Sequence, residues 1–296
     1  MKPLSSFLAI WLMHLGSAQA IVYVDGSSTT WSPMVGNYDF HTDQQTGGTT
    51  NPSSSDLVGG TGANYGFLVA FNDNGDVSSI DGTMGFRVRL DINGGTTNNP
   101  AFNAVVWVGI DANTDGNLDV FFGANFQGSN SQLEIRDPGD AVNTSPSTTS
   151  ISNATYKTYT LDTIEDATPA NFSYRPVDFL TDGGTTDDVT GGTIGDGDYY
   201  LSFMIPFADL VTYLGSLQTP INITDRSPLR YVVATSTQVN SLNQDLGGVN
   251  GGVSSTVRWD APGGGMTAPV TPVPEPSGSA LLLGSLAAGC FIRRRH

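Results

Sequence analysis

The sequence contains very little cysteine and histidine, and each shortage removes a class of chemistry. The single cysteine, Cys290, lies near the C-terminus, so the main part of the chain has no disulfide and no thiol nucleophile. His14 and His296 lie close to the two ends, which leaves His41 as the one histidine between them. One histidine offers little from which to build a Ser/His/Asp triad or a zinc site.

Basic side chains are also scarce. Between positions 21 and 262 there are 27 acidic side chains against Lys157 and seven arginines, a net charge near −19. This excess argues against binding to nucleic acid or to an anionic membrane surface. It suits divalent cations and solubility in a hydrated matrix. The segment is long enough to bury a core without covalent cross-links.

Glutamate is rare as well. Because aspartates are numerous, a carboxylate pair for glycoside hydrolysis stays open as an alternative, but Glu134 and Glu165 are the only glutamates before the C-terminal segment. Nothing in the sequence marks a pair at a working distance, and no Gly-rich phosphate loop follows a strand in a βαβ setting. We therefore predict that the protein is not an enzyme.

The N-terminal 20 residues have the features of a signal peptide. Lys2 precedes the apolar run 7–13, and the segment ends with Ala18 and Ala20 in the small-x-small arrangement that signal peptidase cleaves. We predict that residues 1–20 are removed by signal peptidase. The alternative is a first core strand.

The C-terminal segment 273–296 has the features of a short membrane anchor. Its uncharged run reaches about 24 Å as a helix, less than the ~30 Å hydrocarbon core, which suits a transient anchor better than a permanent one. We predict a transmembrane helix over 278–292, whose end is held in the cytoplasm by Arg293, Arg294 and Arg295. The alternative is a buried core helix followed by a basic surface patch.

The order of these features has a known counterpart. Pro274, Glu275 and Pro276, followed by a short apolar helix and a terminal arginine cluster, closely resemble the PEP-CTERM tail of exosortase substrates. The resemblance covers only this tail. It implies a Gram-negative bacterium, recognition by exosortase at the inner membrane and cleavage near Pro-Glu-Pro. Release or re-anchoring at the cell surface or in extracellular polymer would follow.

Between the two ends, apolar segments of five to nine residues alternate with clusters of Gly, Asn, Asp, Ser and Thr. This alternation is typical of an all-β protein with long loops. We predict an antiparallel, jelly-roll-like β-sandwich domain over 21–262, with long polar loops and one short helix. The candidate strands are 66–71, 85–92, 102–110, 118–126, 132–136, 156–161, 199–205, 229–235 and 256–259.

Two of these strands have informative patterns. In the second candidate, apolar residues alternate with Arg87, Arg89 and Asp91, which predicts one buried face and one solvated face. Segment 104–108 is apolar on both faces, as expected for a strand in the middle of a sandwich.

One helix is predicted. Pro206 can open it, apolar residues recur at helical spacing after it, and Gly215 can close it. Residues 263–272 combine three consecutive glycines with spaced prolines, which predicts a linker to the tail. Three long polar stretches are predicted to be surface loops: 42–62, 137–154 and 181–198.

The loop that follows the strand 102–110 carries one pattern with specific chemistry. Oxygen-bearing side chains stand at loop positions one, three, five and nine, with Gly at position six. A hard cation such as Ca²⁺ needs oxygens that converge on a tight turn. We predict a structural Ca²⁺ at the end of this hairpin. The predicted ligands are Asp111, Asn113, Asp115, Asp119 and the main-chain carbonyl of Asn117.

The loop departs from an EF-hand, because Phe122 stands where the bidentate glutamate is expected and strands flank it. It looks more like the Asp-x-Asn-x-Asp-Gly-x-x-Asp calcium loops of extracellular repeat proteins, with one or two further ligands from another loop or from water. The alternative is a turn without metal, since Asn, Asp and Gly favour turns. A weaker cluster at 72–76 is predicted to be a turn. Asp187–Asp188 and 196–198 are predicted to be solvated carboxylates, although either could complete the site.

A second resemblance is vaguer. The predicted strand 199–205 and the helix after it look like the late strand and helix of DOMON-like and carbohydrate-binding β-sandwiches, a likeness that transfers no ligand-contacting residue. An exposed tryptophan could stack on a sugar ring. Trp107 and Trp259 lie within predicted strands and are predicted to be core residues, whereas the place of Trp31 is left open.

These features predict a non-enzymatic, calcium-stabilised protein of a Gram-negative bacterium. It is exported by way of the inner membrane, processed by exosortase, and placed at the cell surface or in an extracellular matrix of exopolysaccharide. The first alternative is a polysaccharide-binding module of the cell surface, with exopolysaccharide as its partner. The second is a glycoside hydrolase. No nucleic-acid partner is expected.

Overall fold

The computed structural model describes residues 22–24, 31–34, 56–60, 65–72, 80–91, 95–100, 103–128, 131–163, 170–182, 186–189, 197–249 and 254–272. The predicted signal peptide 1–20 and the predicted tail 273–296 lie outside these ranges. Within them, no helix has both the length and the apolar character needed to cross a membrane.

The first sheet has six strands, all antiparallel. Its order is β1-β3-β4-β12-β11, and β2 also pairs with β4. The long central pairing runs from Thr83 opposite Pro206 to Asp91 opposite Asp198. The strands are β1 (Ser32–Pro33), β2 (Asp56–Leu57), β3 (Phe67–Asn72), β4 (Thr83–Asp91), β11 (Phe172–Pro176) and β12 (Asp198–Pro206).

The second sheet also has six antiparallel strands, in the order β10-β9-β8-β7-β13-β14. Four strands that are consecutive in sequence are neighbours here, so this part is a meander and differs from the paired Greek keys of the predicted jelly roll. The strands are β7 (Val105–Asp111), β8 (Val120–Asn125), β9 (Gln132–Pro138), β10 (Ile151–Thr160), β13 (Arg230–Ser236) and β14 (Asp245–Leu246). A separate small hairpin joins β5 (Gly95–Thr96) to β6 (Asn99–Pro100).

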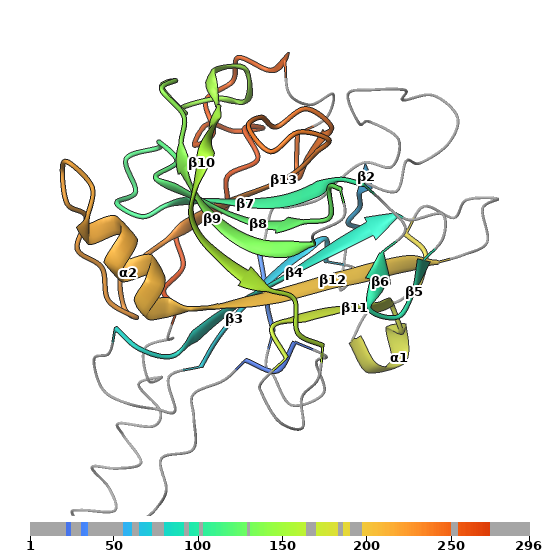
Figure 1. Cartoon of the computed structure of the whole chain (residues 1–296). Coiled ribbons are helices and arrows are strands. Elements are labelled where there is room, and N and C mark those ends of the chain that lie inside the picture. The colour runs from blue at the N-terminus through green and yellow to red at the C-terminus, as the bar shows by residue number, and fades with distance from the viewer. Residues whose placement is uncertain are drawn as a thin grey trace, which may run out of the picture.

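The two sheets face each other across one core, which confirms the all-β prediction (Figure 1). Phe86 of β4 is central to it. Its ring stacks on Phe122 of β8 with centroids 5.9 Å apart and meets Tyr231 of β13 edge-on at 6.0 Å. Aromatic side chains of both sheets therefore interlock, and such contacts add to the free energy gained by burying their apolar surface.

A second cluster covers the outer face of the β7 sheet. Trp107, Phe121 and Trp259 are fully buried there beneath loops. This confirms that strand β7 is buried on both faces and that Trp107 and Trp259 are core residues. The indole N–H of Trp259 donates a hydrogen bond to Oγ1 of Thr149 at 2.9 Å, which satisfies its only donor.

The predicted helix is present as α2 (Phe207–Gly215), at one end of the two layers (Figure 1). It follows Pro206, as expected, and turns Phe207, Leu210 and Leu214 into the core. Two short helical elements were not predicted: α1 (Phe179–Asp182) and the 3₁₀ turn η1 (Pro146–Thr148).

Two strand predictions differ from the structure. The segment 256–259 is a turn and not a strand, because Trp259 anchors it by its side chain while its N–H donates to the Thr144 carbonyl oxygen. Strand β11 was missed, since Phe172–Pro176 alternates without an apolar run and ends in proline.

The prediction that one face of β4 is solvated is also wrong. Arg87, Arg89 and Asp91 are all buried, because a further layer of chain covers this face. The Arg87 guanidinium lies 4.3 Å from the centroid of the Trp31 ring, and Arg89 pairs with Asp198. A period of two identifies the residues that share a face, but it does not tell whether loops cover that face.

Residues 263–272, predicted as a linker, pack on the domain. Leu229 and Val270 exchange main-chain hydrogen bonds of 2.8 and 2.9 Å, and the Thr267 N–H donates to the Tyr231 carbonyl oxygen at 2.9 Å. The segment thus continues the edge of the second sheet, and the packed domain extends to residue 272. The Gly- and Pro-rich composition predicted a flexible segment. Its main-chain groups nevertheless bond to Leu229 and Tyr231 at the edge of the second sheet.

Candidate metal-binding loop and the adjacent groove

The loop 111–119 closes the β7–β8 hairpin. Asp111 is the last residue of β7, and the Asp119 N–H donates to the Ile110 carbonyl oxygen at 2.7 Å before β8 begins. The strands on either side pair in register, with Ile110 opposite Val120. The acidic pattern found in the sequence therefore lies at a hairpin end, as predicted.

Side chains of the loop bond to its own main chain. The Asp111 carboxylate accepts hydrogen bonds from the N–H groups of Asp115 at 3.2 Å and Gly116 at 3.0 Å. The Asp115 carboxylate accepts one from Asn117, and the Asp119 carboxylate accepts one from Ala112. These bonds give acceptors to N–H groups of the loop that are outside the strand pairing, including that of the buried Gly116.

The three aspartates repel one another. Burial, followed by the charges of Asp111 and Asp115, raises the pKa of Asp119 to about 7, although hydrogen bonding to Ala112 acts in the opposite direction. Burial, followed by the charge of Asp115, also raises the pKa of Asp111. A divalent cation would remove this repulsion, so the donor chemistry fits Ca²⁺.

The geometry fits Ca²⁺ less completely. Among the described residues, no group of three or more His, Cys, Asp or Glu side chains is arranged to hold a metal ion. The carboxylates of Asp111, Asp115 and Asp119 point to separate N–H donors, and Asn113 is exposed. Calcium would have to draw these oxygens together.

Two neighbouring elements hold the loop from outside. The Tyr213 hydroxyl, on α2, donates to the main-chain oxygen of Asp119 at 3.3 Å. On the other side, Gly116 adopts φ +87°, and a Cβ placed there would lie 2.7 Å from the Asp260 carboxylate. The loop is therefore fitted against its surroundings at both ends.

Of the other predicted carboxylates, Asp196 lies outside the described residues, and Asp187 and Asp198 do not join this loop. Asp187 is exposed, as predicted, but Asp198 is buried in the first sheet, where it accepts hydrogen bonds from Arg89 and the Val189 N–H. Its sequence neighbours, Gly and Asp, suggested a solvated loop. The sequence did not reveal the ion pair, because Arg89 lies 109 residues away. In the weaker cluster 72–76, Asn72 ends β3 and the remaining residues lie outside the described ranges.

Of the glutamates considered for glycoside hydrolysis, only Glu134 lies in the described part of the chain. Glu134 is buried on β9 and accepts hydrogen bonds from Asn125, Gln132 and Arg136. These three hydrogen bonds hold its carboxylate against neighbouring side chains. Glu165 and His41 lie outside the described residues.

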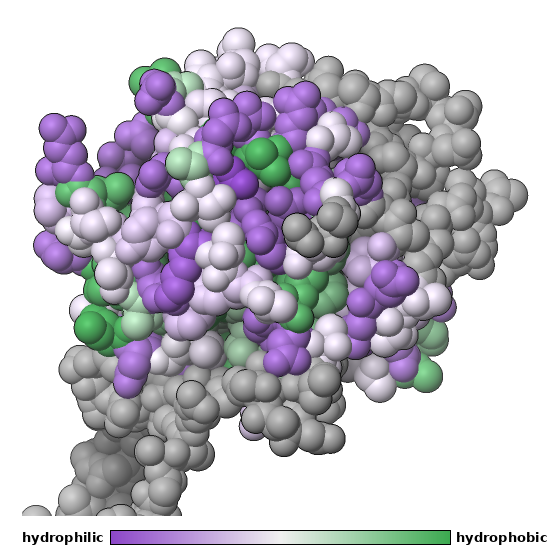
Figure 2. Space-filling view, in the orientation of Figure 1, coloured by the Kyte–Doolittle hydropathy of each residue, from purple (hydrophilic) through white to green (hydrophobic). Residues whose placement is uncertain are grey.

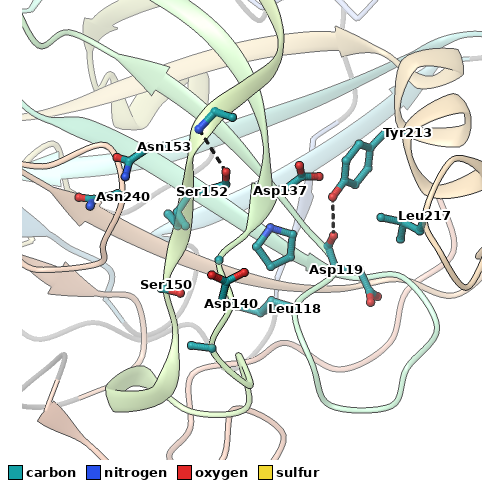
Figure 3. A pocket seen from close by; sticks show the side chains of 15 residues that line it. Leu118, Asp119, Asp137, Asp140, Ser150, Ser152, Asn153, Tyr213, Leu217 and Asn240 are labelled. Carbon is teal, nitrogen blue, oxygen red and sulfur yellow. Dashed lines mark hydrogen bonds between the residues drawn. The ribbon is translucent and has the colours of Figure 1, made fainter.

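A groove of about 900 Å³ adjoins the loop, and we call it the α2–β10 groove (Figure 3). Figure 3 shows Tyr213 and Asp119 on one side and Ser152, Asn153 and Asn240 on the other. Asp137 and Asp140, from the end of β9 and the turn after it, lie between the two sides. The groove is thus built from segments far apart in sequence.

Sequence reasoning missed this groove and the exposed aromatic ring beside it. Tyr156 of β10 is 42 % exposed, and its ring meets Tyr213 edge-on with centroids 5.0 Å apart. Trp31, whose place was left open, is partly buried against Arg87. A tyrosine among alternating Thr and Lys residues gives no sequence signal that it stands next to a groove.

The residues assigned to processing, Ala18, Ala20, Pro274, Glu275, Pro276 and Arg293 to Arg295, lie outside the described residues. Comparisons of the chain with models of protein families, with curated proteins and with solved structures give no match.

Proposed function

We propose that this chain is a non-enzymatic, calcium-stabilised protein of the bacterial cell surface or extracellular matrix. The proposal rests on the two terminal segments, which pair a signal peptide with a tail of the PEP-CTERM kind. Signal peptidase would cleave after Ala20. Exosortase would then process the tail, which is held in the inner membrane by the helix 278–292 until it is cleaved near Pro274–Pro276.

Fractionation followed by mass spectrometry of both termini tests this route. We expect the extracellular fraction to contain a chain that begins at Ile21 and ends near Glu275. A cytoplasmic protein with an intact His296 would refute the route. A variant in which Arg293, Arg294 and Arg295 are all replaced by Ser should remain unprocessed. The control Arg226→Ser, which changes an exposed arginine of the domain, should be processed normally.

The calcium part of the proposal is carried by the mutual repulsion of Asp111, Asp115 and Asp119 within one hairpin loop. A ligand that binds only the folded state, at about 100 times its dissociation constant, adds roughly 2.7 kcal/mol of stability. That increment matters for a domain whose stability comes from packing alone, with no cysteine in 21–262.

Melting curves in calcium and in EDTA test it. EDTA should lower the melting temperature of the wild type and of Asp187→Ala, whose aspartate is exposed outside the loop. It should leave Asp115→Ala unchanged. If EDTA has no effect on the wild type, or lowers all three proteins equally, the loop is only a turn.

A second candidate is a polysaccharide-binding module. The observation that favours it is the exposed ring of Tyr156, which contacts Tyr213 in the wall of the polar α2–β10 groove. A structural matrix role and a binding role share the same route of export, so binding measurements separate them.

A further inference from the structure

The lining of the α2–β10 groove restricts the charge of a ligand. Asp119, Asp137 and Asp140 contribute three carboxyl groups, and no lysine or arginine is among the lining residues that the structure describes. An anionic ligand would meet unbalanced negative charge, which costs free energy on binding. A ligand must therefore be neutral or cationic and must offer hydrogen-bond donors.

The other lining residues favour a ligand that both donates and accepts hydrogen bonds. Asn153 and Asn240 are exposed at the edge of the groove, and each carboxamide has two donors and one acceptor oxygen. Ser150 and Ser152 add hydroxyl groups. A simple cation would use only the acceptors, whereas a polyhydroxylated ligand would use both kinds of group.

Tyr156 adds an apolar surface at the margin of the groove, because its ring contacts that of Tyr213, which lines the groove. The Tyr156 ring is 42 % exposed and is held by the edge-on contact with Tyr213, whose hydroxyl donates a hydrogen bond to the main-chain oxygen of Asp119. A sugar ring combines outward hydroxyls with an apolar C–H face, and an aromatic ring can cover that face at little entropic cost.

The geometry points to the α2–β10 groove as a binding site for a neutral polysaccharide. The carboxylates of Asp137 and Asp140 and the carboxamides of the groove would take the sugar hydroxyls, and Tyr156 would stack on a ring. A volume of about 900 Å³ lies within the usual range of small-ligand sites, so the groove would hold a short stretch of the chain. This inference deepens the binding alternative above.

The site is also coupled to the calcium loop, a step that rests on the proposed function. Asp119 belongs to both the loop and the groove wall, and Tyr213 bonds to its main-chain oxygen at 3.3 Å. Calcium would fix the position of this wall before the sugar arrives. By linkage, calcium and polysaccharide should strengthen each other's binding by the same factor.

The test is titration calorimetry of the full chain with a panel of neutral, anionic and cationic oligosaccharides, in calcium and in EDTA. We expect a neutral oligosaccharide to bind, Tyr156→Ala to weaken it about tenfold or more, and Tyr156→Phe to retain it. The matched control is Phe179→Ala, because Phe179 is similarly exposed, at 38 %, but lies on α1. Circular dichroism would check that each variant is folded.

The outcomes separate the two proposals. Binding of no neutral sugar, binding only of a cationic one, or equal losses for Tyr156→Ala and Phe179→Ala would overturn the groove assignment. If calcium stabilises the protein but no sugar binds, the groove assignment fails and the calcium proposal stands. If EDTA changes neither the melt nor the sugar binding, the groove assignment stands and the calcium proposal fails.

Discussion

Arg89 and Asp198 form an ion pair that is closed off from solvent, with side chains 0 % and 1 % exposed. Arg89 lies on β4 and Asp198 on the neighbouring strand β12, on the face of the first sheet away from the main core. Burial, opposed by Arg89 and by the Val189 N–H, raises the pKa of Asp198 to about 6. Burying the two charges therefore costs free energy of desolvation, which their mutual attraction offsets only while both partners are present.

Asp198→Ala should therefore lower the free energy of unfolding by about 3–5 kcal/mol, because it leaves the buried charge of Arg89 without its ion-pair partner. The double variant Arg89→Met with Asp198→Leu should recover most of that loss. Urea unfolding of the three proteins is the measurement. A double variant as unstable as the single one would show that the pair itself stabilises the fold.

Asp182 predicts a dependence on pH. Burial acts to raise its pKa, but hydrogen bonds from Arg175 and the Asp178 N–H outweigh this, so its pKa is lower than usual. Its contribution to stability is present above the unfolded pKa of about 3.9 and is lost as pH falls through the lower, folded value.

Asp182→Asn should accordingly cost about 1–3 kcal/mol at pH 7 and progressively less below about pH 4. Unfolding curves at several pH values measure the difference from wild type, with the exposed Asp187→Asn as control. A difference that stays constant down to pH 2 would contradict the assignment.

Gly116 predicts a sensitive point in the candidate metal loop. Gly116→Ala would place a side chain in a left-handed conformation and press it on Asp260 at 2.7 Å, whereas Gly128, with φ +75°, has nothing within 4 Å of a Cβ. Both variants should show strain of about 1–3 kcal/mol, and Gly116→Ala should lose more. Equal melting temperatures for the two would show that the Asp260 turn simply moves aside.

Segment 263–272 predicts where the domain can be cut. A chain ending at Pro272 keeps the bonds of Thr267 to Tyr231 and of Val270 to Leu229, and one ending at Pro262 loses them. Because each lost hydrogen bond costs about 0.5–1.5 kcal/mol, the shorter chain should melt at a lower temperature. Melting both chains side by side checks this, and identical melts would mean that the segment is a linker after all.

The sequence alone predicted the all-β class, the helix α2 and the hairpin position of the loop 111–119, and eight of its nine candidate strands overlap an observed strand. These features depend on local periodicity, on Pro206 before a helix and on turn residues between strands, all of which act over a few residues. The burial of Trp107 was equally predictable, since an uninterrupted apolar strand needs cover on both faces.

Only the tertiary structure decided what covers each face. Arg87, Arg89 and Asp198 looked solvated because their partners lie far away in the sequence, and the α2–β10 groove joins Tyr213 to residues more than 50 positions earlier. The same holds for residues 263–272, whose flexible composition is outweighed by the edge of β13. Ion pairs, grooves and edge pairing depend on contacts between distant segments, and those contacts arise only when the two sheets pack on each other.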